Sequence, residues 1–111
     1  MTAQPLVSVR VATYKHERWI AQCLEGILMQ RTSFPFEVIV GEDCSADGTR
    51  TIVADYARRH PDRIRALLHD ANLGGQLNSY RIRQACRGKY HAMVEGDDYW
   101  IDPLKLQKQV D

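Results

Sequence analysis

Segments typical of strands alternate with segments typical of helices along nearly the whole chain. Alternating and β-branched residues predict strands over residues 6–12, 36–40, 64–68 and 90–94, and apolar residues at helical spacing predict a helix after each of them. This order is typical of a mostly parallel sheet with helices on both faces, a three-layer α/β fold. The 111 residues suffice for one such domain, residues 1–111, with a single core.

The helices differ in how clearly the sequence defines them. From residue 17, two rows at four-residue spacing form one apolar helix face, the first of Trp19, Cys23 and Ile27 and the second of Ile20, Leu24 and Leu28. Pro61 ends the second helix, and a weaker third helix spans about residues 76–87 before Gly88. Asp102 suits the N-cap of a fourth helix and Pro103 its first position.

Composition and charge exclude several classes of protein. The 15 basic and 14 acidic residues nearly balance, which argues against bulk electrostatic binding of nucleic acid. No segment approaches the apolar length that spans a membrane, and residues 1–5 lack a secretory signal. The cysteines, Cys23, Cys44 and Cys86, show neither disulfide nor zinc-site spacing. We therefore expect a cytoplasmic protein with reduced thiols, and membrane association stays open for a longer full-length protein.

An acidic motif, Glu95-Gly96-Asp97-Asp98, follows the last predicted strand, whose apolar residues 90–94 predict burial. Three carboxylates held together repel one another and resist leaving water, so something must offset that cost. A hard divalent cation is the simplest candidate, and Mg²⁺ is usually held by one or two carboxylates plus substrate phosphates. A solvated acidic turn that caps the next helix is the alternative, and the motif alone favours neither.

A second acidic loop, residues 42–49, follows the second predicted strand. Asp47 or Ser45 can cap the helix that follows, but capping does not explain Glu42 and Asp43 directly after the strand. A carboxylate at that place can accept hydrogen bonds from a nucleobase imide or a ribose hydroxyl. The chain contains neither a G-x-x-x-x-G-K-[ST] loop nor a G-x-G-x-x-G loop, so a metal would have to take much of the charge of a bound phosphate.

Five segments in this order resemble family 2 glycosyltransferases with the GT-A fold, a Rossmann-like architecture. They are Val7-Ser8-Val9 leading to Thr13-Tyr14, residues 42–49, Asn72-Leu73-Gly74, Gly88-Lys89-Tyr90 and residues 95–100. The resemblance implies that the chain is the N-terminal, nucleotide-sugar-binding portion of such an enzyme. It implies that the loop after the second strand holds the base and ribose. The acidic motif would hold Mg²⁺ or Mn²⁺ on the diphosphate.

The resemblance also implies a set of site residues. Tyr14 would lie near the base, Asp43 would accept from its imide, and Asp97 and Asp98 would serve the ribose and the metal, with Asp98 as the direct ligand. The full donor-binding set is Thr13, Tyr14, Glu42, Asp43, Ser45, Asn78, Glu95, Gly96 and Asp97, and the metal ligands are Asp98 and Asp97. Two positions depart from the family pattern. Glu95 stands where Asp is usual, and Ser79-Tyr80 stands where Arg-Asn is frequent, with Asn78 or Arg81 as the substitute.

The expected function is metal-dependent transfer of a sugar, with inversion, from a UDP-sugar to a hydroxyl of a saccharide or lipid-linked acceptor. The resemblance places this reaction in cell-surface polysaccharide synthesis. One alternative is a sugar nucleotidyltransferase, which would need a glycine-rich first loop that residues 13–16 do not provide. A non-catalytic nucleotide-binding module is the other.

The sequence stops about two turns into the fourth predicted helix. We therefore expect the front part of a longer, truncated enzyme, with the acceptor half and the unknown catalytic base beyond Asp111. Such a piece would bind donor without transferring sugar. Apolar surface made for the missing half would be exposed, and a homodimer through that face is a further expectation.

Overall fold

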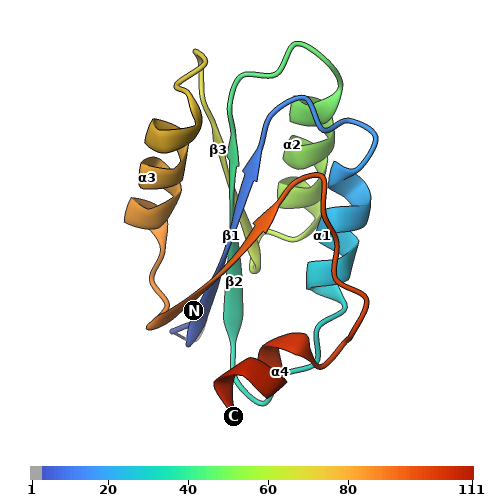
Figure 1. Cartoon of the computed structure of the whole chain (residues 1–111), viewed down its shortest axis with the longest axis vertical. Helices are drawn as coiled ribbons and strands as arrows, with labels where there is room; N and C mark the ends of the chain where they lie inside the picture. Colours follow the sequence, from blue (N-terminus) through green and yellow to red (C-terminus); the bar gives the residue numbers. More distant parts are fainter. Residues whose placement is uncertain (1–3) are drawn as a thin grey trace.

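The computed structural model describes residues 4–111 as one four-stranded parallel sheet flanked by helices (Figure 1). The elements follow one another as β1 (Val7–Thr13), α1 (Ile20–Leu28), β2 (Phe36–Glu42), α2 (Thr49–Arg59), β3 (Ile64–Leu68), α3 (Gly75–Ala85), β4 (Tyr90–Glu95) and α4 (Lys105–Val110). The strand order is β3-β2-β1-β4, and every neighbouring pair is parallel. The predicted alternation of strands and helices is confirmed.

Helices cover both faces of the sheet, as predicted. α1 and α2 lie together on one face, while α3 packs against β1 and β2 on the other (Figure 1). Valines of β1 and β2 meet the apolar face of α1 in the main core, which includes Val9, Val11, Val38, Val40, Ile20, Leu24 and Ile27. Burial of these branched apolar side chains against one another makes the largest favourable contribution to the free energy of folding.

β1 and β2 form the centre of the sheet. All seven residues of β2 are buried, because β1 and β3 pair with its two edges and helices cover its two faces. β2 continues two residues beyond the predicted end at Val40, so that Gly41 and Glu42 belong to the sheet and not to the loop. This extension places Glu42 level with Thr13, the last residue of β1.

The prediction that residues 90–94 form a buried strand is wrong in one respect. β4 is one of the two edge strands of the sheet, and Val94 is the one buried residue of β4. The strand is apolar as predicted, but Tyr90 is 48 % and Met93 71 % exposed. Within residues 4–111 no strand pairs with the outer side of β4, and α3 lies over β1 and β2. The acidic motif therefore follows a half-solvated strand.

Two helix starts differ from the prediction. The spacing predicts Trp19 in the apolar row of α1, but Trp19 is the N-cap residue and is exposed. α4 begins at Lys105, two residues after Pro103, because Asp102 instead closes a local turn by accepting the backbone N–H of Leu104 at 2.9 Å. Asp47 does act at the start of α2, where its carboxylate accepts from the backbone N–H of Thr49 at 3.0 Å, although the N-cap position is Gly48.

Trp100 packs in the core. Its backbone lies so close to Gly26 of α1 that a Cβ on Gly26 would stand 3.0 Å from the nitrogen of Trp100. The thiols of Cys23, Cys44 and Cys86 are free. None of the helices within residues 4–111 combines the length and apolarity needed to cross a membrane.

Candidate functional site

The carboxyl ends of β1, β2 and β4 lie together at one end of the sheet, which is where open α/β sheets bind their ligands. The register pairs Thr13 with Glu42 and Ala12 with Glu95. Each flanking loop is tied back to β1, because Asp43 donates its backbone N–H to the Thr13 carbonyl at 3.1 Å and Gly96 donates to the Ala12 carbonyl at 3.0 Å. The two acidic loops that the sequence singled out therefore flank the same strand.

Two neighbouring hollows lie at this end of the sheet. The first, of about 330 Å³, is lined by Ala12, Thr13, Tyr14, His16, Asp43, Asn72, Gly74, Gly75, Asn78 and Glu95. The second, of about 390 Å³, is lined by Arg10, Ala12, Gly75, Ser79, Ile82, Met93, Val94, Glu95 and Asp98. Because Ala12, Gly75 and Glu95 belong to both, the hollows form one continuous crevice. Five predicted donor residues line the first hollow, and the predicted metal ligand Asp98 lines the second.

Asp43 is the most firmly held carboxylate of the crevice. It is 4 % exposed, and its two oxygens accept backbone N–H groups from Leu73 at 2.7 Å and from Gly74 at 3.0 Å. Asn72 closes the arrangement by donating its side-chain amide to the Asp43 carbonyl at 3.1 Å. Gly74 has a φ of +86°, a conformation that glycine adopts without strain. A carboxylate oxygen has lone pairs to spare after one such bond, so Asp43 can still accept from a ligand.

Glu42 and Ser45 support this loop from inside. Glu42 is fully buried, and its carboxylate accepts the Ser45 N–H at 2.9 Å and lies 3.4 Å from a guanidinium nitrogen of Arg50. Ser45 in turn accepts the backbone N–H of Lys15 at 2.8 Å. These partners hold the loops after β1 and β2 together, and neither Glu42 nor Ser45 lines the hollows. Their contact with a donor stays a prediction.

The acidic turn packs on the side chains of Thr13 and His16. The Thr13 hydroxyl lies 3.0 Å from Nδ1 of His16, and Gly96 packs directly on this pair. A Cβ on Gly96 would stand 2.7 Å from Nδ1 of His16 and would also overlap the Thr13 hydroxyl. Nε2 of His16 lies 3.8 Å from a carboxylate oxygen of Asp97. Glycine at position 96 is therefore required for the turn to approach β1.

Asp97 and Asp98 are exposed at the end of the turn. Asp98 accepts the backbone N–H of Tyr99 at 2.8 Å through one oxygen. No group of three His, Cys, Asp or Glu side chains with metal-binding geometry occurs within residues 4–111. Two carboxylates completed by phosphate oxygens are nevertheless the usual donor set for Mg²⁺, so Asp97 and Asp98 fit a divalent ion that arrives with a diphosphate.

The negative charge of this turn affects the pKa of a buried thiol. Burial, followed by the charges of Asp98, Asp97 and Glu95, raises the pKa of the Cys23 thiol to about 12. Cys23 lies beneath the turn, with its sulfur 3.6 Å from the Glu95 carbonyl.

Asn78 and Tyr14 both line the first hollow but differ in their exposure to solvent. Asn78 is buried, and both of its amide atoms have partners, Nε2 of His69 at 2.9 Å and the Gly41 carbonyl at 3.1 Å. It therefore joins α3 to β2, and its proposed donor contact would need one of these bonds to be shared. Tyr14 differs in being 39 % exposed, and the Lys15 ammonium nitrogen lies 5.2 Å from the centre of its ring.

Sequence reasoning missed His16 and Arg50. His16 lies three residues after Thr13, in a loop that already carries two predicted site residues, and this position is the one signal that points to it. Arg50 gave no signal, because its contacts with Glu42 and the His69 carbonyl depend on how α2 packs against β2 and β3.

The parallel α/β sheet is that of the GT-A class of domains. The family model of Glycosyl transferase family 2 matches residues 8–111. The chain belongs to glycosyltransferase family 2, as the resemblance implied.

Relatives and solved structures agree with this assignment. An uncharacterized protein of Mycobacterium tuberculosis, Rv1520, is 45 % identical over 104 residues, which cover 94 % of this chain and 30 % of that protein. TuaG of Bacillus subtilis, provisionally named a teichuronic acid biosynthesis glycosyltransferase, is 33 % identical over 97 % of this chain and 42 % of its own length. The S. aureus protein TarS, residues 1–349 in complex with UDP, superposes with a TM-score of 0.79 and 31 % identity over 94 % of this chain and 30 % of that one.

A further structure is the mannosyltransferase PcManGT from Pyrobaculum calidifontis in complex with GDP-Man and Mn²⁺. It superposes with a TM-score of 0.84 and 26 % identity over 98 % of this chain and 32 % of that one. The chain thus spans about a third of the length of these relatives.

Proposed function

We propose that the chain is the donor-binding part of a glycosyltransferase that moves a sugar from a nucleotide-sugar to an acceptor hydroxyl. The observation that carries this proposal is the crevice itself, which brings Asp43 and the Glu95–Asp98 turn to one strand end in a family 2 chain. The complexes of TarS with UDP and UDP-GlcNAc and of PcManGT with GDP-Man and Mn²⁺ support a nucleotide-sugar as the ligand. We take a UDP-sugar as the donor, because TarS has the higher identity of the two.

The crevice divides into a nucleoside part and a diphosphate part. In the first hollow the Tyr14 ring stacks on the base and Asp43 accepts from its imide, while the Leu73–Gly74 turn keeps the Asp43 carboxylate in place. In the second hollow Asp98, assisted by Asp97, holds a divalent ion. That ion, when bound, would neutralise the diphosphate and stabilise it as a leaving group.

The remaining parts of the function are proposals for the whole protein. Displacement with inversion at the anomeric carbon needs a base that takes the proton of the acceptor hydroxyl, and we assign no residue of the described chain to it. The name of TuaG supports cell-surface polysaccharide synthesis with a saccharide or lipid-linked acceptor. A cytoplasmic location fits a domain that uses nucleotide-sugars. We also propose a second copy of the chain as a partner, through the apolar face that the acceptor half would otherwise cover.

Calorimetric titration tests the metal assignment. UDP is titrated into the chain in Mn²⁺, in Mg²⁺ and in a chelator, and the two metals should tighten binding. Asp98→Asn keeps the shape of the side chain but removes ligand charge. It should weaken the metal-dependent part by at least the roughly 10–100-fold that loss of an outer-shell partner costs a metal site, and it should spare uridine.

The matched control is Asp62→Asn. Asp62 is an exposed acid before β3, at the far end of the sheet from the crevice, and its substitution should change neither affinity. Equal UDP affinity in all three conditions would remove the metal from the proposal. Absence of UDP binding in every condition would contradict the donor site as a whole.

A further inference from the structure

Arg10 is a charged residue in a central strand of the sheet. It lies in the middle of β1, which pairs with β2 on one edge and with β4 on the other. Val9 and Val11 point into the core that α1 covers, so Arg10 between them points to the side of α3. An arginine is rarely placed in such a position without a partner that compensates for its charge.

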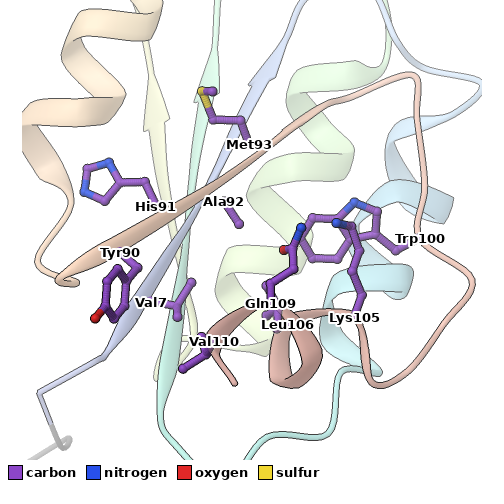
Figure 2. Close-up of a pocket in the computed structure, with 10 residues that line it drawn as sticks. All are labelled: Val7, Tyr90, His91, Ala92, Met93, Trp100, Lys105, Leu106, Gln109 and Val110. Atoms are coloured by element: carbon purple, nitrogen blue, oxygen red, sulfur yellow. The ribbon is translucent and has the colours of Figure 1, made fainter.

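The Arg10 side chain lies between α3 and β4. Its Nη2 donates to the Ser79 hydroxyl at 3.0 Å and lies 3.4 Å from the Ser79 carbonyl oxygen. Its register partner on β4 is Met93, and Figure 2 shows the Met93 side chain leaving β4 on the opposite side from Ala92. Register partners share a face of the sheet, so Arg10 and Met93 both line the second hollow of the crevice.

The guanidinium group of Arg10 has donors to spare. It carries five N–H groups, and within residues 4–111 only those of Nη2 have a partner. These residues already exclude solvent from Nε, which makes no hydrogen bond, whereas Nη1 remains accessible. The described part of the chain also gives Arg10 no ion pair. Because buried polar groups are nearly always paired, an arginine left in this state indicates a ligand.

The charges of the crevice indicate which ligand it would be. Asp43 and Glu95 line the first hollow, and Glu95 and Asp98 line the second. Among the residues that line the two hollows, Arg10 is the one arginine or lysine. A diphosphate in the second hollow would be repelled by the carboxylates, and a guanidinium is the side chain that matches phosphate oxygens in charge and in geometry.

Two residues of α3 were the sequence's candidates for the donor contact that Ser79-Tyr80 leaves open. Arg81 is exposed, its Nη1 lies 3.4 Å from the side-chain oxygen of Gln84, and it lines neither hollow. Asn78 uses both of its amide atoms within the fold. Arg10 reaches the crevice from β1 instead, beside Ser79.

We propose that Arg10 binds the diphosphate of the donor through its free guanidinium donors. This inference rests on the proposed function and adds a contact that does not pass through the metal. Ser79 holds the guanidinium through Nη2, and Nη1 donates to the phosphate oxygens. A methionine could fill the same place in the sheet without charge, whereas the charge of an arginine is stabilised there when an anion neutralises it.

Calorimetric titration of UDP and of uridine into the chain in Mn²⁺ tests this contact. Arg10→Met keeps a long, unbranched side chain but removes the guanidinium. It should weaken UDP binding roughly tenfold, the order expected for a hydrogen bond to a charged group, and should leave uridine binding unchanged. Arg81→Met, the same change on the exposed side of α3, is the matched control and should alter neither affinity.

Two further variants separate binding from packing. Arg10→Lys keeps the charge but not the planar fork, so it should recover part of the lost affinity and bind UDP about threefold more weakly than the original chain. Ser79→Ala removes the bond that orients the guanidinium and should also weaken UDP about threefold, with no effect on uridine. Circular dichroism checks that each variant is folded, and Ser79→Ala tests the contact even if Arg10→Met does not fold.

The outcomes separate this inference from the proposed function. If UDP bound the original chain with metal dependence and bound Arg10→Met or Ser79→Ala equally well, Arg10 would have no role in binding, while the donor site would stand. An equal loss of UDP and uridine affinity in a folded Arg10→Met variant would show that Arg10 only supports the structure. An original chain that bound neither ligand would contradict the proposed function and this inference with it.

Discussion

Asp43 accepts a hydrogen bond of 3.0 Å from the backbone N–H of Gly74, which joins the loop after β2 to the turn before α3. Together with the bond from Leu73, this contact fixes the carboxylate at the floor of the first hollow. A carboxylate held by two backbone donors needs no reorganisation when a ligand arrives, which reduces the entropic cost of binding. Asp43 therefore has both a structural role and, in the proposed function, a ligand-binding role.

Both roles of Asp43 can be measured in one variant. Asp43→Ala should weaken uridine and UDP by a similar factor, since one hydrogen bond to a charged acceptor contributes roughly 1.5–3 kcal/mol. It should also lower the free energy of unfolding by about 1–3 kcal/mol, because the N–H groups of Leu73 and Gly74 lose their acceptor. Calorimetry and urea denaturation give the two values. A variant that lost only the metal-dependent part of UDP affinity would show that Asp43 does not recognise the nucleoside.

The packing of the acidic turn on Thr13 and His16 leads to a prediction about Gly96. Gly96→Ala should displace the acidic turn, because the added Cβ would overlap the Thr13 hydroxyl and stand 2.7 Å from Nδ1 of His16. We expect a loss of about 1–3 kcal/mol in the free energy of unfolding, the typical cost of overpacking, and weaker metal-dependent UDP binding.

The glycine at position 75 provides the matched control for stability. A Cβ on Gly75 would meet no atom within 4 Å, so Gly75→Ala at the start of α3 should be neutral or should stabilise the fold by up to about 1 kcal/mol. Denaturation curves of the two variants, recorded side by side, compare the same chemical change at the two positions. If Gly96→Ala were as stable as Gly75→Ala, the turn would not depend on its close approach to β1.

Much of the fold was predictable because its signals are local. The strand and helix periods around Val9, Val38 and Leu24 depend only on neighbouring residues, and the parallel sheet follows from their alternation. The position of β4 was not predictable in the same way. An apolar run such as residues 90–94 shows that a strand forms, but which strand ends at the edge of the sheet depends on the whole topology.

In the candidate site, too, some features follow from local sequence and others depend on the whole topology. The places of Asp43 and Asp98 followed from their positions directly after strands, because the carboxyl ends of parallel strands gather at one edge. Glu42 contacts Arg50 of α2, and Asn78 contacts His69, the residue directly after β3. Local sequence gives no information on these contacts. The close contact between Gly96 and His16 likewise exists only after β4 has paired with β1.

The last prediction concerns the pH dependence of stability and a buried acid at the other end of the sheet. Burial alone would raise the pKa of Glu37, but hydrogen bonds from the Ser8 hydroxyl at 2.6 Å and from Arg87, together with the Arg87 charge, hold it below its ordinary value of 4.5. The ionised form is thus favoured in the folded state. Its contribution to stability is present above pH 4.5 and is lost as the pH falls through the lowered pKa.

Two variants separate this contribution from general acid unfolding. Glu37→Gln should reduce the free energy of unfolding at pH 7, and the difference from the original chain should shrink steadily below pH 4.5. Ser8→Ala keeps the carboxylate but removes one donor, so it should raise the pKa of Glu37 and shift the acid loss of stability to higher pH. Urea denaturation at a series of pH values, followed by circular dichroism, measures both effects. A difference between Glu37→Gln and the original chain that stayed constant down to pH 2 would show that the Glu37 charge does not contribute to the stability of the fold.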